Sequence, residues 1–259
     1  MSPLIRVTTV VALAMLVIVA LAAVAAEAPQ APAGNEPPNP QRAAAEQELA
    51  RLRTDWAQLL HYREENLRLP PASAAAPRVI FIGDSITQSW HLPDLGLTRL
   101  DVLNRGISGQ TTPQMLVRFQ QDVVRLRPAV VHILAGTNDL AENTGPTTLA
   151  AIEDNFRSMV EIAQANHIRV VLASVLPTVD YPWRRGLQPA PRITALNAWL
   201  RDYARQHKLV YIDYYSALAD AAGGLKSSLS EDGVHPNPAG YAVMKPLARQ
   251  SVTQALGQH

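Results

Sequence analysis

The first residue that could do chemistry is a serine that follows an apolar run. Residues 79–82 have the composition of a buried strand, and Gly83-Asp84-Ser85 then forms a tight turn at which a helix begins. A hydroxyl in this position lies at the carboxyl edge of a sheet, where open α/β sheets bind ligands. The backbone N–H of Ser85 lies at the positive end of the helix and is suited to bind an oxyanion.

Three further polar segments extend this pattern. Residues 104–112, which include Gly109, follow the second apolar run, and Gly136-Thr137-Asn138-Asp139 follows the third. Asp232 precedes His235 by three positions, just before the last helical segment. Each segment alone is typical of an ordinary turn, but four of them in this order are hard to obtain by chance. A serine, a histidine and a carboxylate are side chains that nucleophilic catalysis uses.

The elements that must position these residues alternate between strand-like and helical patterns. We expect strands at residues 79–82, 102–103, 130–134, 170–176 and 209–212. We expect helices where apolar residues share one face at 149–163 and 193–203, and where Asn237-Pro238 suits the first turn of a helix. This alternation predicts one α/β domain, residues 75–259, with a mainly parallel sheet covered on both faces.

Composition excludes several classes of function. Lys and Arg number 23 against 22 Asp and Glu, so charge gives no reason to expect a nucleic-acid or anionic-membrane partner. The chain has no cysteine, which excludes disulfides, thiolate metal sites and a cysteine nucleophile. No cluster in the sequence has metal-ligand spacing, and there is no glycine-rich phosphate loop. We therefore expect no metal.

The N-terminal part of the chain has a different composition. Residues 1–26 are typical of a secretory signal peptide, although an uncleaved membrane anchor would look similar, and either places the rest of the chain outside the cytoplasm. Residues 27–41 form a Pro/Ala-rich linker. Residues 42–74 form a helical arm, in which one face is expected to pack on the domain or to contact another subunit. That face comprises Leu49, Leu52, Trp56, Leu59 and Leu60.

On its four polar segments the chain resembles the SGNH, or GDSL-type, hydrolase superfamily. The resemblance runs from Arg78 to about Pro246, and the four letters fall on Ser85, Gly109, Asn138 and His235. It implies a three-layer, flavodoxin-like α/β/α fold with a five-stranded parallel sheet in the order 2-1-3-4-5. That order has its switch point at the serine, in agreement with the placement from the sequence alone.

The resemblance also implies roles for these residues and no cofactor. Ser85 would be the nucleophile, His235 its general base, and Asp232 the residue that orients His235. The N–H groups of Ser85 and Gly109 and the amide of Asn138 would bind the oxyanion. Gln110 stands where many relatives have Asp, a departure that bears on substrate fit.

The substrate is left open. The sequence looks most similar to the bacterial thioesterase/lysophospholipase and platelet-activating-factor acetylhydrolase-like branch, which implies cleavage of an acyl or acetyl ester, a lysophospholipid or a thioester. A carbohydrate acetyl esterase is the alternative, and a catalytically inactive acyl-glycan-binding or envelope-anchored module is an alternative of another class. Trp90, Tyr181 and Trp183 are candidate substrate contacts, with core packing as the alternative for Trp90. The sequence predicts no oligomeric state.

Overall fold

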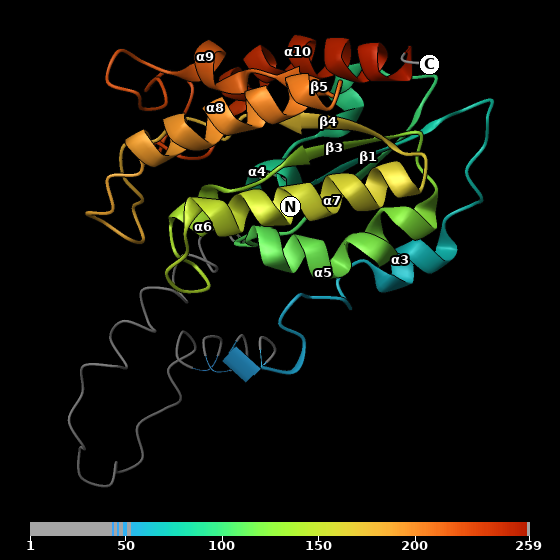
Figure 1. Cartoon of the computed structure of the whole chain (residues 1–259), viewed down its shortest axis with the longest axis horizontal. Helices are drawn as coiled ribbons and strands as arrows, with labels where there is room; N and C mark the ends of the chain where they lie inside the picture. Colours follow the sequence, from blue (N-terminus) through green and yellow to red (C-terminus); the bar gives the residue numbers. More distant parts are fainter. Residues whose placement is uncertain (1–42, 44–45, 47–48, 51–52, 258–259) are drawn as a thin grey trace, which may run out of the picture. The chain divides into compact units, whose positions relative to one another are not determined.

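The computed structural model describes residues 43, 46, 49–50 and 53–257. The chain divides into two compact units, Met1–Gln58 and Leu59–His259. The second unit carries the sheet and all four polar segments (Figure 1). The expected signal peptide, residues 1–26, and the expected linker, residues 27–41, lie outside the described residues, and so does Leu52 of the expected arm.

Five parallel strands form one sheet in the order β2-β1-β3-β4-β5. Their bounds are β1 Arg78–Gly83, β2 Asp101–Gly106, β3 Val130–Leu134, β4 Arg169–Ala173 and β5 Val210–Ile212. The predicted fold and strand order are confirmed. β2 and β3 lie on opposite sides of β1, so the order in which strands are added to the sheet changes direction at β1. This switch point lies at the carboxyl end of β1, which Ser85 follows.

Helices cover both faces of the sheet, which gives three layers (Figure 1). One face packs against α5 Thr112–Asp122, α7 Leu149–Ala165 and α8 Ala190–Gln206, and the other against α4 Ser85–Gln88, α9 Tyr214–Leu218 and α10 Pro238–Leu256. The shorter elements are α3 Arg63–Arg68, α6 Thr137–Leu140 and the 3₁₀ turns η1 Leu92–Leu95 and η2 Val124–Leu126. In β1, Ile80 and Ile82 point to the first face and Val79 and Phe81 to the second, so both faces bury apolar side chains.

The described part of the expected helical arm is helical only in part. Residues 49–50 and 53–54 are helical, but the chain then turns through Trp56–Tyr62 before α3 begins at Arg63. Gln58 has a φ of 56°, which is incompatible with the interior of a right-handed helix. The turn leaves Leu59 and Leu60 exposed, at 36% and 63%.

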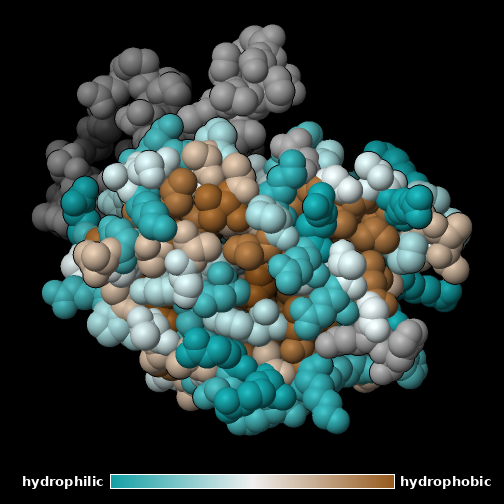
Figure 2. Space-filling model, turned by 90° about the horizontal axis from the view of Figure 1, so that it is seen from above, coloured by the Kyte–Doolittle hydropathy of each residue, from teal (hydrophilic) through white to brown (hydrophobic). Residues whose placement is uncertain are grey.

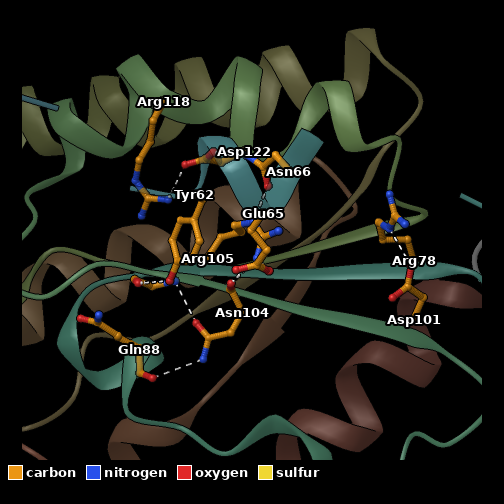
Figure 3. A network of polar contacts seen from close by, with 11 residues as sticks. Tyr62, Glu65, Asn66, Arg78, Gln88, Asp101, Asn104, Arg105, Arg118 and Asp122 are labelled. Atoms are coloured by element: carbon orange, nitrogen blue, oxygen red, sulfur yellow. Dashed lines mark hydrogen bonds and ion pairs between the residues drawn. The ribbon is translucent and has the colours of Figure 1, made fainter. Parts of the chain in front are cut away.

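Polar side chains hold α3 and Tyr62 against β2 and α5 (Figure 3). The hydroxyl of Tyr62 donates to the carbonyl of Gly106 at 2.5 Å, and Asn66 donates to Asp122 at 2.7 Å. The buried guanidinium of Arg105 donates to Glu65 at 2.8 Å and to Asn66 at 3.0 Å. Burial raises the pKa of Tyr62 to about 12, so its hydroxyl remains a donor even at mildly alkaline pH.

The surface over the α9 and α10 side is mixed in character. Figure 2 shows hydrophobic residues there in several areas that hydrophilic residues separate. None of the helices in the described part of the chain combines the length and the apolar character that a membrane span requires.

Candidate active site

Ser85, His235 and Asp232 form a line of hydrogen-bonding side chains at the carboxyl edge of the sheet. The Oγ atom of Ser85 lies 2.9 Å from Nε2 of His235, and Nδ1 of the same ring lies 2.6 Å from Oδ2 of Asp232. The first contact joins residues 150 positions apart in the sequence. A line of this kind can pass a proton from the serine hydroxyl to the imidazole while the carboxylate holds the ring.

Asp232 uses its two carboxylate oxygens for different purposes. Oδ1 accepts from the backbone N–H groups of Val234 and His235, at 2.9 and 2.8 Å, and lies 3.2 Å from the hydroxyl of Ser230. Oδ2 faces the imidazole. Burial by itself would raise the pKa of Asp232, but the hydrogen bonds and charge of His235 and the backbone donors hold it below its ordinary value. The residue that shapes the turn therefore also presents an ionised oxygen to His235.

The start of α4 presents Ser85 to the site. The side chain of Asp84 caps this helix by accepting from the N–H of Ile86 at 3.0 Å, and Tyr241 of α10 donates to the carbonyl of Ile86 at 2.8 Å. Asp84 is buried, and burial raises its pKa to about 6 despite the Ile86 hydrogen bond. These contacts fix the first turn of α4, at which Ser85 lies.

The second polar segment packs directly on α4. The N–H of Ser108 donates to the side chain of Gln88 at 2.7 Å, and a Cβ atom on Gly106 would lie only 2.2 Å from the Gln88 backbone nitrogen. Gly109 has a φ of 77°, which favours glycine. At Gly106 this segment therefore lies too close to α4 for any side chain to fit. At Gly109 its backbone is left-handed, which favours glycine for a separate reason.

The third segment places Asn138 on α6. Its Nδ2 donates to the carbonyl of Gln110 at 3.1 Å, which ties α6 to the second segment. The neighbouring Asp139 is buried and accepts from the backbone and hydroxyl of Thr112, at 2.9 and 2.6 Å. Burial raises the pKa of Asp139 to about 6, although the Thr112 hydrogen bonds oppose this shift.

The three aromatic candidates for substrate contact have different surroundings. Trp90 is 4% exposed and packs on Phe81 and Tyr214, so it belongs to the core, which is the alternative that the sequence left open. Tyr181 has no exposed surface, and its hydroxyl lies 3.2 Å from that of Thr137, so its expected role in substrate contact is not supported. Trp183 is half-buried, and its ring centre lies 6.1 Å from that of His235.

A cavity of about 220 Å³ lies beside the triad, next to Asp232 and Gly233. One wall comes from the loop that carries Trp183, and another from the turn after α9. Its other lining residues are Thr178, Val179, Asp180, Pro182, Arg185, Asp220, Gly224 and Leu225. The loop after β4 therefore borders this cavity.

Sequence reasoning missed two side chains that hold the site together. Asn143 donates to Asn138 and to the carbonyl of Gly109, and the buried Arg118 donates to the carbonyl of Gly83 and to the Gln110 side chain. The signal for Asn143 was its place five residues after Asn138, shortly beyond the third polar segment. Arg118 carried no signal, because it lies in a helical run. In the described part of the chain no three His, Cys, Asp or Glu side chains are grouped to hold a metal ion.

Comparison with known proteins agrees with this geometry. The family model for the GDSL-like lipase/acylhydrolase family matches residues 81–243. A GDSL-like lipase from Bacteroides thetaiotaomicron has a similar structure, with a TM-score of 0.73 and 41% identity over 77% of this chain and 98% of that one. An isoamyl acetate-hydrolyzing esterase 1 homolog from Bos taurus is 29% identical over 68% of this chain and 83% of its own length. Esterase TesA from Pseudomonas aeruginosa is 28% identical over 63% of this chain and 81% of its own length.

Proposed function

Because the chain belongs to the GDSL-like lipase/acylhydrolase family, we propose that it hydrolyses carboxylic esters through an acyl-enzyme intermediate on Ser85. The observation that carries this proposal is the continuous line from Ser85 Oγ through His235 to Asp232, with contacts of 2.9 and 2.6 Å. The reaction class agrees with the two esterases to which the chain is similar.

In the first half of the reaction, Ser85 Oγ attacks the ester carbonyl carbon while Nε2 of His235 takes its proton. The negative charge then develops on the carbonyl oxygen. The N–H groups of Ser85 and Gly109 and the Nδ2 of Asn138 bind this charge, and loss of one such donor typically lowers kcat by about 10²–10³-fold. Asp232 stabilises the imidazolium that forms.

The tetrahedral intermediate collapses to the acyl-enzyme when the imidazolium returns its proton to the departing alcohol. Water then enters, His235 removes one of its protons, and the hydroxide equivalent attacks the acyl carbon. The carboxylic acid leaves and Ser85 regains its proton. Every proton in this cycle passes through Nε2 of His235, so the reaction depends on the tautomer that Asp232 maintains at Nδ1.

A polar cavity lies beside Asp232, and its lining includes the side chains of Thr178, Asp180, Arg185 and Asp220, which can donate to or accept from hydroxyls. Neither Ser85 nor His235 lines this cavity. An alcohol portion that carries hydroxyl groups, as in an acetylated carbohydrate, would find hydrogen-bonding partners there. A carbohydrate acetyl esterase is the second candidate function, within the same reaction class.

We further propose that residues 1–26 direct export and that the enzyme acts outside the cytoplasm. This proposal rests on the uncharged run that precedes Glu27. Cell fractionation and N-terminal sequencing of the recovered protein test this. A mature protein that begins at or near residue 27 is the expected result. Recovery of the full chain from the cytoplasm would contradict it.

The reaction is tested on the chain lacking residues 1–26. We expect it to hydrolyse p-nitrophenyl acetate and to be labelled by a fluorophosphonate, while Ser85→Ala loses both properties and Ser89→Ala, a control in the same segment, keeps them. Labelling of another serine would overturn the assignment of Ser85. Comparison of acetylated xylan with lysophospholipid then distinguishes the two substrate classes, and inactivity on every ester would leave only the binding-module hypothesis.

A further inference from the structure

A side-chain amide that takes no part in the mechanism above connects two of the proposed oxyanion-binding segments. The Nδ2 of Asn143 donates to Oδ1 of Asn138 at 2.8 Å and to the backbone carbonyl of Gly109 at 3.2 Å. An amide nitrogen has two hydrogens, so these two contacts use its full donor capacity. Asn143 thus spans the gap between the second and third polar segments.

The contact with Asn138 decides which way the Asn138 amide faces. Because Oδ1 of Asn138 accepts from Asn143, its Nδ2 is directed away from that contact, and one hydrogen of Nδ2 goes to the carbonyl of Gln110 at 3.1 Å. The second hydrogen is the one that a substrate oxygen can accept. A rotation of the Asn138 amide by 180° would bring two amide nitrogens together and would remove the donor from the site.

The orientation of Asn143 is determined in turn by Trp183. The indole Nε1 donates to Oδ1 of Asn143 at 3.1 Å, and Arg184 forms an ion pair with Glu142 at 3.0 Å. These two contacts tie the loop after β4 to the loop after α6. Since Trp183 also lies beside the His235 ring, one chain of contacts runs from the base side of the site to the oxyanion side.

We propose that Asn143 is a positioning residue for ester hydrolysis, which holds the Asn138 amide and the Gly109 segment in register for the transition state, with Trp183 fixing its orientation. This inference rests on the proposed function, because it requires Asn138 to bind the oxyanion. Misplacement of a catalytic group by about 1 Å can lower the rate by about 10²-fold. A donor that is misdirected rather than deleted therefore has a large effect on kcat and little effect on ground-state binding.

The test is a double-mutant cycle on kcat and KM for p-nitrophenyl acetate, with Asn138→Ala, Asn143→Ala and the double variant. We expect Asn143→Ala to lower kcat by about 10- to 100-fold at nearly constant KM. Because it acts largely through Asn138, its effect should shrink several-fold in the Asn138→Ala background. Equal effects in both backgrounds, or an unchanged kcat, would overturn the proposal.

Two further variants address orientation and folding. Asn143→Asp keeps the size of the side chain but removes its donor, so it should lower kcat at least as much as Asn143→Ala. Trp183→Phe keeps a ring beside His235 and removes only the N–H, so we expect a smaller loss, of about 3- to 10-fold. Wild-type kcat in Asn143→Asp would show that donation by this amide is irrelevant, and wild-type kcat in Trp183→Phe would remove Trp183 from the proposal.

Asn197 provides the matched control for loss of a buried amide. Its side chain accepts from the N–H of Val175 at 2.8 Å and donates to the Val175 carbonyl at 2.9 Å, as a brace on backbone after β4. Asn197→Ala should lower the melting temperature without the kcat-specific loss. An equal loss of kcat in both alanine variants would assign the Asn143 effect to general destabilisation. If Asn138→Ala retained full kcat, the oxyanion assignment would fail as well, whereas a loss confined to Asn138→Ala would refute only the role of Asn143.

Discussion

Replacement of Asp232 by asparagine separates the two tasks that its carboxylate combines. The backbone N–H groups of Val234 and His235 donate to one oxygen, and the imidazole of His235 faces the other at 2.6 Å. In the variant, the amide oxygen should take the place of Oδ1, because the reverse orientation would leave two donors opposite an NH₂ group. Each unsatisfied donor costs about 1–3 kcal/mol, so the preference amounts to roughly 2–6 kcal/mol.

The amide NH₂ group then faces Nδ1 of His235 and can only donate to it. The ring is forced into the tautomer that carries its proton on Nε2, which directs an N–H towards Ser85 Oγ 2.9 Å away. This nitrogen can no longer accept the serine proton. The same exchange in a Ser-His-Asp protease lowers kcat by about 10⁴-fold, and we expect a loss of about 10²–10⁴-fold here. At about 1.36 kcal/mol per factor of ten, this corresponds to roughly 3–5 kcal/mol of activation free energy.

The assay combines kcat on p-nitrophenyl acetate with thermal melting. Because the hydrogen bonds of the turn are kept, the melting temperature should stay within about 4 °C of the parent value, which corresponds to roughly 1 kcal/mol. Asp213→Asn is the control, since Asp213 also accepts from a backbone N–H, that of Ser216, but faces no histidine. Retention of most activity together with a large loss of stability would refute the reasoning and would make Asp232 a turn residue beside a Ser–His dyad.

Asn138→Ala should lower kcat by about 10²–10³-fold at nearly constant KM if its amide binds charge that develops in the transition state, and a change confined to KM in steady-state kinetics would contradict this. Burial lowers the pKa of His132 from 6.5 to about 3, so the stability that this neutral group contributes is complete above pH 6.5 and is lost as the pH falls towards 3. The loss amounts to roughly 2 kcal/mol at pH 5. In urea unfolding, His132→Phe should lack this loss of stability between pH 6.5 and pH 3. Asp84 and Asp139 titrate in the parent and in the variant, so the difference between the two pH profiles reports on His132. Parallel pH profiles of the free energy of unfolding would be evidence against this assignment. Gly106→Ala should lose several kcal/mol of stability or fail to fold, because its Cβ would lie 2.2 Å from the α4 backbone, and a parent-like melting temperature would disprove the close contact.

Much of the architecture could be predicted because it depends on local patterns. The apolar runs at 79–82 and 130–134 became the buried strands β1 and β3, and the amphipathic patterns at 149–163 and 193–203 became α7 and α8. The first three polar segments directly follow their strands, so any parallel arrangement of those strands brings these segments to one edge. The strand order itself came from the family resemblance, since local patterns do not specify which strands are neighbours.

The surroundings of individual side chains could not be predicted in the same way. Trp90 and Tyr181 became core residues, whereas Trp183, two residues after Tyr181, borders His235. The arm has a helical pattern in the sequence, but the left-handed Gln58 interrupts the helix, and the polar contacts of Tyr62 and Asn66 carried no sequence signal. Each of these outcomes depends on which distant segment packs against the residue, and sequence spacing carries no such information.

The sequence by itself therefore determined the reactive residue types, the place of three of the polar segments at strand ends and the alternation that makes a parallel α/β sheet. Only the tertiary structure decided how those residues are held. Ser85 meets His235 across 150 positions, and Asn143 joins Asn138 to Gly109 while Trp183 reaches it from another loop. Hydrogen bonds of this kind act over about 3 Å and require a particular orientation of both partners. They exist only after the sheet has brought its loops together, which is why residue type and order predict the chemistry but not the support around it.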